Sequence, residues 1–171
     1  MQIVLLGYMG SGKTTIGKIL ADKLNVKCLD LDQYIEGAEG KDISSLFKEK
    51  GEIYFRKKEA ESLREVLSTK DDFVLSIGGG TPCYANNMSA IFDMTENGIY
   101  LKVGLDELVK RLSKEKTKRP LIASIPEVEL HEFIGKHLFE RSFYYNQASH
   151  VVNCDDKSIQ EIVIEIESLL S

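Results

Sequence analysis

Nine residues near the start of the chain, Gly7 to Thr15, read Gly-Tyr-Met-Gly-Ser-Gly-Lys-Thr-Thr. They match the pattern G-x-x-x-x-G-K-[ST], in which successive backbone N–H groups surround phosphate oxygens. Lys13 can reach the terminal phosphates of a nucleoside triphosphate, and the hydroxyl of Thr14 can bind Mg²⁺. A glycine-rich turn without a ligand is the alternative. The apolar run before the loop and the helical pattern after it favour a nucleotide site, with contacts from Gly10, Ser11, Gly12, Lys13, Thr14 and Thr15.

Two carboxylates, Asp30 and Asp32, end the next apolar segment, which predicts a strand over residues 26–32. Their spacing of two lets both side chains point to the same side of a strand. Beside a triphosphate, one of the two carboxylates can hold Mg²⁺ through its water shell, and the other can orient a substrate hydroxyl and accept its proton. The alternative is that both carboxylates only cap the following helix. The neighbouring phosphate loop favours the catalytic interpretation.

Two arginines on expected helices can recognise an anion. Arg56 and Glu59 stand three residues apart on one helix face. On spacing alone, a surface ion pair of little consequence is favoured over a guanidinium held ready for a substrate carboxylate. Arg141 lies on the apolar stripe of its helix, where a cation needs an anionic partner. That partner is either a core carboxylate or, as we favour, a bound anionic substrate.

Two further segments carry groups that suit a phosphate site. Gly78, Gly79 and Gly80 follow a buried strand directly and offer N–H groups without blocking side chains, although a flexible turn is the alternative. Residues 114–126 contain two prolines and lack clear periodicity, which predicts a mobile loop. This loop is either a solvated surface or a lid in which Arg119 neutralises a transferring phosphoryl group. Its cations are Lys114, Lys116, Lys118 and Arg119.

The elements that must position these residues alternate along the chain. Apolar runs predict strands over 2–6, 26–32, 73–77, 99–103 and 150–152. Helical patterns predict helices at about 33–39, 43–50, 52–68, 86–93, 106–113, 127–148 and 158–170, with Gly51 separating the second from the third. The alternation predicts a single α/β domain over residues 1–171, with three αβα layers around a five-stranded parallel sheet. Its ligands should bind beyond the carboxyl ends of the strands.

The composition excludes several classes of protein. A formal net charge of −5 disfavours nonspecific binding to nucleic acid or to an anionic membrane. Three scattered cysteines indicate a reducing compartment, and the immediate start of a strand leaves no room for a signal peptide. No apolar run is long enough to span a membrane. We therefore expect a cytoplasmic protein, and nothing demands more than a monomer. The three histidines show no metal-ligand spacing, and we assign them no role.

Taken together, these motifs make the chain resemble the shikimate kinases, which are P-loop small-molecule kinases with a nucleoside monophosphate kinase-like fold. The resemblance covers nearly the full length. It rests on the Gly7–Thr14 loop, Asp30-Leu31-Asp32, the segment from Gly51 through Arg56 to Glu59, Gly78–Gly80, Arg119-Pro120-Leu121, and Arg141 with Tyr144 and Tyr145. It implies transfer of the γ-phosphate of ATP to the 3-hydroxyl of shikimate, on the route to aromatic amino acids.

The resemblance also implies residue roles. Thr14 and Asp30 would hold Mg²⁺, and Lys13, Asp32 and Arg119 would be catalytic. Asp32 would bind the shikimate hydroxyls, while Arg56 and Arg141 would bind its carboxylate and Gly78, Gly79 and Gly80 would contact it. Arg111 would stack on adenine, and the loop from Asn153 would border the base. A helical segment at about 32–60 would hold the substrate, and residues 114–126 would be the lid. Ile122 and the extra lysines depart from the family pattern there.

Other functions remain possible from the residues alone. A kinase for another small hydroxylated acid, such as gluconate, or for a nucleoside monophosphate would use the same loop, although a nucleotide acceptor would need a second base site and more cations. A GTP-dependent switch is disfavoured because the chain lacks an Asn-Lys-x-Asp segment for reading guanine. A regulatory ATPase would leave Arg141 unexplained on its apolar stripe.

Overall fold

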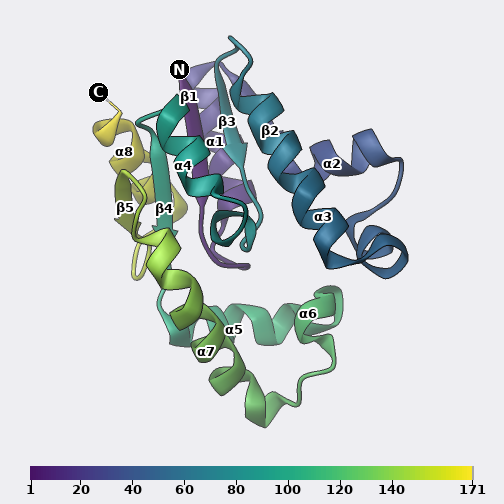
Figure 1. The fold of residues 1–171 in the computed structure, drawn as a ribbon. Coiled ribbons are helices and arrows are strands. Elements are labelled where there is room, and N and C mark those ends of the chain that lie inside the picture. The colour runs from purple at the N-terminus through teal and green to yellow at the C-terminus, as the bar shows by residue number, and fades with distance from the viewer. Residues whose placement is uncertain (171) are drawn as a thin grey trace.

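The computed structural model describes residues 1–170, which form a five-stranded parallel sheet with helices on both faces (Figure 1). The strands are β1 (Gln2–Leu6), β2 (Lys27–Asp30), β3 (Phe73–Ser76), β4 (Gly98–Lys102) and β5 (His150–Asn153). Their order is β2-β3-β1-β4-β5, so the strand that precedes the glycine loop lies at the centre. The predicted α/β class, with three layers and five parallel strands, is confirmed.

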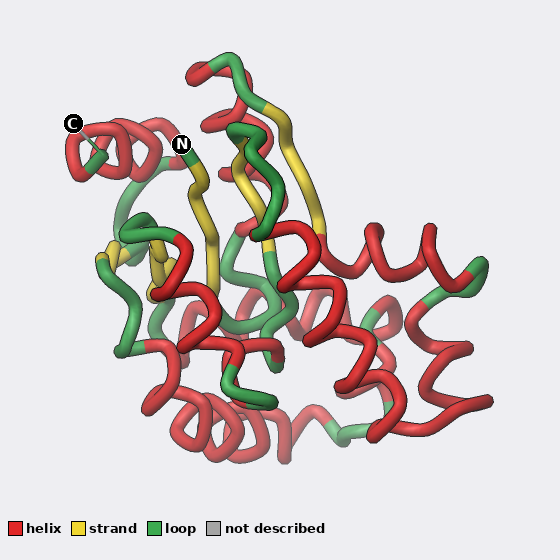
Figure 2. Tube along the Cα trace, turned by 45° about the horizontal axis from the view of Figure 1, so that its top comes forward, coloured by secondary structure: helices red, strands yellow, loops and turns green. Residues whose placement is uncertain are grey.

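The central strands are covered on both sides, which explains their continuous apolar sequence. Residues 3–6 of β1 and 73–75 of β3 have no solvent-exposed surface. On one face, α1 (Lys13–Leu24) packs against β2 and β3 and contacts α8 (Ile159–Leu169). On the other face, α4 (Asn87–Met94) packs against α3 (Ile43–Leu67) (Figures 1 and 2). The sheet is therefore a rigid base for the loops at its carboxyl edge.

Two groups of helices extend from this edge (Figure 1). On one side, α2 (Leu31–Glu39) and α3 pack against each other and form an arm. On the other side lie α5 (Leu105–Glu115), α6 (Pro120–Ala123) and α7 (Glu127–Tyr145), with α5 packed on α7. The carboxyl ends of the central strands open between the two groups, and ligands of open α/β sheets bind at such a position.

Gly51 divides α3 into two helices, as the sequence predicts. Its φ of 84° and ψ of 171° lie far from helical values, so the chain kinks there. A left-handed φ is accessible to glycine at little cost, whereas a side chain would strain the backbone. This residue therefore sets the angle between the tip of the arm and the part of α3 that carries Arg56.

One prediction about the carboxylates is wrong. β2 ends at Asp30, and Asp32 lies in the first turn of α2 rather than on a strand. The side chain of Asp30 accepts a hydrogen bond from the backbone N–H of Gln33 at 3.0 Å, so Asp30 caps α2. Asp30 therefore caps the helix, and its carboxylate also lines the cavity described below. The physical reason is that an aspartate at this position satisfies an otherwise unpaired N–H and starts the helix early.

The prediction of an unstructured loop over residues 114–126 is also wrong. α5 continues to Glu115, a 3₁₀ turn covers Lys116–Lys118, and α6 starts at Pro120. Proline suits the first position of a helix, because its missing N–H would be unpaired there anyway. Single helical turns are too short to show periodicity, so the sequence pattern did not reveal them. The mobility of this segment stays a prediction.

The three cysteines form no disulfide bonds with one another. Cys28, Cys83 and Cys154 are all free thiols, at exposed, intermediate and buried positions respectively. Burial raises the pKa of Cys154 to about 11, so this thiol is part of the core rather than a nucleophile. Within residues 1–170, no helix combines the length and the apolar character that crossing a bilayer requires.

Candidate active site

The glycine loop joins β1 to α1 at the carboxyl edge of the sheet. Gly10 and Gly12 have φ values of 80° and 94°, which glycine adopts without strain. The Nζ of Lys13 donates hydrogen bonds to the carbonyl oxygens of Gly7 at 2.7 Å and Tyr8 at 3.1 Å. Burial, together with the positive charge of Arg119, lowers the pKa of Lys13 to about 8. A bound anion would stabilise this half-buried cation, so the loop is suited to phosphate.

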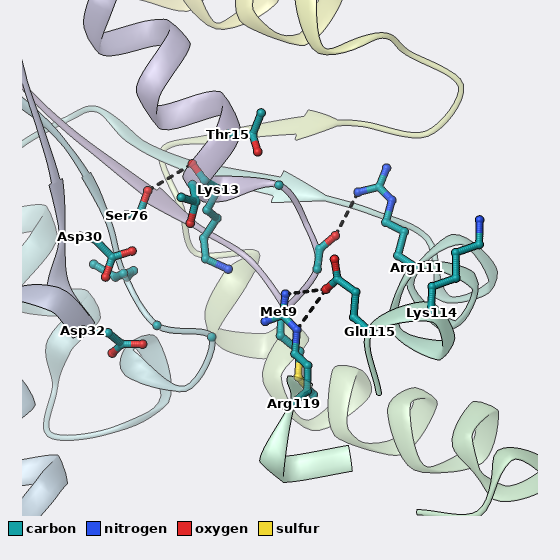
Figure 3. Close-up of a pocket in the computed structure, with 16 residues that line it drawn as sticks. Met9, Lys13, Thr15, Asp30, Asp32, Ser76, Arg111, Lys114, Glu115 and Arg119 are labelled. Atoms are coloured by element: carbon teal, nitrogen blue, oxygen red, sulfur yellow. Dashed lines mark hydrogen bonds and ion pairs between the residues drawn. The ribbon is translucent and has the colours of Figure 1, made fainter. Parts of the chain in front are cut away.

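A cavity of about 510 Å³ lies beside the loop. In Figure 3, Lys13 points between the carboxylates of Asp30 and Asp32 and the ion pair of Glu115 with Arg119. The cavity is lined by Met9, Gly10, Gly12, Lys13, Thr14, Thr15, Asp30, Asp32, Ser76, Ile77, Gly78, Gly79, Arg111, Lys114, Glu115 and Arg119. The fold thus brings most of the predicted site residues together. The predicted residues outside this lining are Ser11, Arg56, Gly80, Arg141 and Asn153.

Asp32 lies in an environment that suits a group handling a proton. Burial raises the pKa of its carboxyl to about 6, and the charges of Asp30 and Glu59 act in the same direction, while Lys13 opposes them. A carboxyl with this pKa remains mainly ionised at neutral pH but is more basic than an exposed aspartate. Asp32 can therefore accept a hydrogen bond, or a proton, from a hydroxyl placed in the cavity.

The donor set beside Lys13 fits Mg²⁺. Thr14, with a hydroxyl oxygen, and Asp30 and Asp32, with carboxylate oxygens, line the same cavity. Residues 1–170 contain no cluster of three or more histidine, cysteine, aspartate or glutamate side chains that could hold a metal by themselves. Mg²⁺ usually takes one or two protein oxygens and completes its shell with water and phosphate. The residues present therefore match a nucleotide-bound Mg²⁺.

Arg56 is held in place by a buried carboxylate. Its Nη1 donates to Glu59 at 2.8 Å, and Glu59 is only 1% exposed. The hydroxyl of Thr81 donates to the same carboxylate at 2.8 Å. The Arg56 guanidinium also lies 4.0 Å from the ring centre of Tyr84. The interpretation of a surface ion pair of little consequence is therefore wrong, because folding buries Glu59.

Arg141 has a different environment, made of aromatic and neutral groups. Its guanidinium carbon lies 5.7 Å from the ring centre of Tyr8, and its positive charge opposes the rise that burial causes in the pKa of Tyr145. Within residues 1–170, the arginines that form ion pairs are Arg56, Arg111 and Arg119, and Arg141 is not among them. The core carboxylate that was the alternative partner is absent from this part of the chain. A half-buried cation of this kind is suited to a bound anion.

The glycines after β3 allow the two arginines to converge. A Cβ atom added at Gly79 would lie 3.0 Å from Nη1 of Arg141, and one at Gly80 would lie 2.7 Å from Nη2 of Arg56. The carbonyl oxygen of Gly79 accepts a hydrogen bond from the hydroxyl of Tyr145 at 2.5 Å. The segment 78–80 is therefore held to α7 by a hydrogen bond, which argues against a flexible turn. Its lack of side chains makes room for the guanidinium groups.

Arg111 and Asn153, the two residues predicted to lie near the adenine base, are in different parts of the structure. Arg111 donates to the Gly10 carbonyl oxygen at 3.0 Å and to Glu107 at 2.9 Å, so it is tied to the glycine loop. It also lines a second cavity of about 840 Å³ formed with the loop after β5. Asn153 is exposed at the end of β5, where its side chain accepts a hydrogen bond from the Asp155 N–H at 3.3 Å. Their adenine contacts stay a prediction.

Arg119 is held at the edge of the cavity by the end of α5. Its Nη2 and Nε lie 2.9 Å and 3.3 Å from one carboxylate oxygen of Glu115. Its charge also reaches Lys13, whose pKa it lowers. Arg119 is therefore close enough to act on the same anion as Lys13.

The sequence interpretation gave no individual role to four residues that shape this site. Tyr8 and His137 hydrogen-bond to each other at 2.9 Å, Tyr145 holds Gly79, and Glu115 holds Arg119. The spacing of four between Glu115 and Arg119 was a usable signal for a helical ion pair. The contact of Tyr8 with His137 joins positions 129 residues apart, and a single sequence gives no local signal for such a pair.

The comparisons with known proteins agree with this geometry. The family model described as shikimate kinase matches residues 9–171. A shikimate kinase from Flavobacterium psychrophilum is 47% identical over 99% of this chain and 98% of its own length. The crystal structure of a shikimate kinase from Bacteroides thetaiotaomicron has a TM-score of 0.91 at 39% identity, covering 99% of this chain and 98% of that one.

The structure of a shikimate kinase from Acinetobacter baumannii in complex with shikimate has a TM-score of 0.88 at 29% identity. It covers 99% of this chain and 92% of that chain. Both the family model and the relatives extend over nearly the whole sequence, including each element that lines the cavity. The chain therefore belongs to the shikimate kinase family.

Proposed function

We propose that this cleft performs the reaction of its family, with ATP on the glycine loop and shikimate beside it. Shikimate kinases transfer the γ-phosphate of ATP to the 3-hydroxyl of shikimate and release ADP. In this chain the acceptor would lie between Asp32, Arg56 and Arg141, against the backbone of residues 78–80. The helical segment 32–60 would supply one wall, and the segment 114–126 would close over the phosphates.

The observation that carries this placement is the environment of Arg141. This half-buried guanidinium lies against the Tyr8 ring, and no carboxylate within residues 1–170 forms an ion pair with it. Arg56, which already has Glu59 as a partner, faces the adjacent Gly80. An anionic substrate between the two arginines would give Arg141 the counter-ion that the protein does not provide. A carboxylated alcohol satisfies this requirement and also offers hydroxyls to Asp32.

The chain's own residues then have distinct tasks in the transfer. The acceptor oxygen bonds to the γ-phosphorus while the bond to the bridging oxygen breaks, and its electron pair remains on ADP. Asp32 orients the acceptor hydroxyl and receives its proton, although a loose transition state makes orientation the larger contribution. Lys13 and Arg119 stabilise negative charge on the phosphate oxygens. Mg²⁺, held by Thr14 and through water by Asp30, would supply further charge neutralisation.

Exclusion of water is the remaining requirement. An open cleft would let water compete with shikimate for the phosphoryl group. Residues 114–126 extend from the end of α5 and carry Arg119 at the rim of the cavity. Closure of this segment over bound nucleotide would both bring Arg119 to the phosphates and displace water from the cleft.

A coupled assay of ADP release tests the function. With ATP and Mg²⁺ present, shikimate should stimulate ADP release, whereas gluconate and nucleoside monophosphates should not. ADP release that shikimate leaves unchanged would contradict the proposal. Stimulation by gluconate instead would identify a kinase for a different hydroxylated acid, the nearest rival for this site.

Substitution of Arg141 tests the placement of the acceptor. Arg141→Ala should raise the KM for shikimate by about 10- to 150-fold, because a hydrogen-bonded charge contributes roughly 1.5–3 kcal/mol. The KM for ATP should change by no more than about twofold, because in this proposal Arg141 binds the shikimate carboxylate and not the nucleotide. Arg141→Lys keeps the charge but not the planar fork and should give an intermediate value. Equal increases in both KM values would make Arg141 a structural residue.

The cellular setting completes the proposal. We expect a cytoplasmic monomer that binds neither nucleic acid nor membrane. The net charge of −5 supports the absence of nonspecific binding to polyanions.

A further inference from the structure

Tyr8 and His137 form a contact between the nucleotide loop and the helix that carries Arg141. The Tyr8 hydroxyl and the Nδ1 of His137 lie 2.9 Å apart. Their rings meet edge to face, with centres 5.4 Å apart and planes inclined by 86°. The two residues are 129 positions apart in the sequence, and the contact joins the loop after β1 to the middle of α7.

The surroundings of both side chains favour this hydrogen bond. Tyr8 is 1% exposed, so its hydroxyl has lost water as a partner and needs one from the protein. His137 provides that partner, and the ring of Phe133 contacts the imidazole with centres 5.7 Å apart. Burial, together with the charge of Arg141, lowers the pKa of His137 to about 4. The imidazole is therefore neutral near pH 7, with one ring nitrogen free to accept from the tyrosine hydroxyl.

The same two residues contact both halves of the site. The backbone carbonyl of Tyr8 accepts hydrogen bonds from Lys13 and from the N–H of Ser11, both at 3.1 Å. On α7, Arg141 follows His137 by four residues and so lies on the same helix face. The Arg141 guanidinium carbon is 5.7 Å from the Tyr8 ring centre. The tyrosine ring therefore links the phosphate loop to the arginine on the acceptor side.

We propose that Tyr8 and His137 are positioning residues for the kinase reaction. Their hydrogen bond fixes the Tyr8 ring against Arg141 and so sets the position of this arginine relative to the nucleotide loop. The inference rests on the proposed function, because it assumes that Arg141 holds the acceptor. Neither residue touches the reacting atoms in this scheme. The bond matters because in-line transfer depends on placing donor and acceptor within a fraction of an ångström.

The substitution Tyr8→Phe tests this role, because it keeps the ring beside Arg141 and removes only the hydroxyl. The KM for shikimate should rise by about 3- to 10-fold, the range that loss of one net hydrogen bond gives. The KM for ATP should stay within about twofold, because the loop backbone is unchanged. His137→Leu removes the same bond from the other side and should give the same pattern.

Two further variants control for structural effects. His137→Asn retains a short polar group that can bond to the Tyr8 hydroxyl, and it should restore the shikimate KM to within about twofold of the parent. Tyr144→Phe makes the same substitution at a tyrosine of α7 whose hydroxyl has no hydrogen-bond partner within residues 1–170, and it should leave both KM values unchanged. The imidazole ¹⁵N shifts of His137 should change in Tyr8→Phe and report the lost bond directly.

The outcomes separate this inference from the function on which it rests. A wild-type protein without shikimate-dependent ADP release would overturn the proposed function and this inference with it. An active wild type with an unchanged shikimate KM in Tyr8→Phe would overturn the inference alone. Equal increases in the two KM values would also overturn it, because they would indicate a general structural role. Failure of His137→Asn to recover where His137→Leu is impaired would contradict the hydrogen bond as the cause.

Discussion

Glu59 holds the acceptor side of the site together from inside the protein. Its two carboxylate oxygens accept hydrogen bonds from Arg56 on its own helix and from Thr81 after β3, each at 2.8 Å. It is 1% exposed, whereas Arg56 is 18% exposed and lies nearer the opening. The carboxylate thus fixes the guanidinium before any substrate arrives. Such preorganisation reduces the ordering that binding would otherwise require.

We expect Glu59→Gln to lower both stability and substrate affinity. The glutamine keeps the shape but leaves Arg56 without its buried counter-ion, and breaking a buried pair from one side typically costs about 3–5 kcal/mol. Urea unfolding should show this loss, and the KM for shikimate should rise. Glu61→Gln removes the surface partner of Lys58 and should cost less than about 1 kcal/mol. Similar losses in the two variants would contradict a special role for Glu59.

Among the elements, the junction of α5 and α6 lies beside the cavity at the glycine loop. The last turn of α5 ends in Glu115, and Arg119 follows one turn later, just before α6. Both side chains line the cavity and pair with each other at 2.9 Å. Nucleotide phosphates would therefore compete with Glu115 for Arg119, and the Glu115 carboxylate would also repel them.

We expect Glu115→Gln to lower the KM for ATP by about two- to fivefold, because an exposed pair of this kind contributes roughly 0.3–1 kcal/mol. Arg119→Ala should act in the opposite direction and reduce kcat as well. Initial rates at saturating shikimate measure both effects. Glu129→Gln, which removes the same charge from the first turn of α7, should leave the KM for ATP unchanged. A Glu115→Gln variant that binds ATP more weakly would refute this competition.

At the scale of the whole molecule, the sheet edge is joined to the distant helix α7. Tyr8 bonds to His137 and Tyr145 bonds to Gly79, so α7 is tied both to the loop after β1 and to the segment after β3. Donation from the Tyr8 hydroxyl to Nδ1 of His137 requires the imidazole to be neutral. The charged groups that act on it are Arg141 and Glu140 on its own helix, and the neutral Tyr8 hydroxyl faces it from the loop.

This arrangement predicts a pH-dependent stability. The pKa of His137 is lowered to about 4 in the folded protein, whereas an unfolded histidine titrates near about 6.5. Between these values the unfolded chain binds more protons, so the free energy of unfolding should fall as the pH is lowered from about 6.5. Above about 6.5 this contribution should be constant.

Unfolding midpoints measured at pH 7.5 and pH 5 in the wild type and in His137→Asn isolate this residue. The difference between the two proteins cancels the groups that titrate in both. We expect the wild type to lose more stability on acidification than the variant. Identical losses would show that His137 titrates at its ordinary pKa in the fold.

The sequence alone determined the parts of this protein that depend on short-range patterns. The glycine loop with Lys13, the order of strands and helices, and the kink at Gly51 each follow from residues within one turn or one strand. Boundaries were less certain, because Asp30 starts α2 by capping it and Pro120 starts α6 within a segment too short for periodicity. The prediction placed Asp32 on a strand, whereas the structure has it in the first turn of α2, where it lines the cavity.

Only the tertiary structure decided which distant residues meet at that cavity. Burial of Glu59, the convergence of Arg56 and Arg141 on Gly79 and Gly80, and the bond from Tyr8 to His137 all depend on the packing of α3 and α7 around the sheet edge. Spacing along the chain specifies which face of a helix a side chain occupies, but not what that face will contact. Packing against remote segments determines those contacts. It is what distinguishes Arg56, paired with buried Glu59, and Arg141, packed against Tyr8, from arginines on the surface.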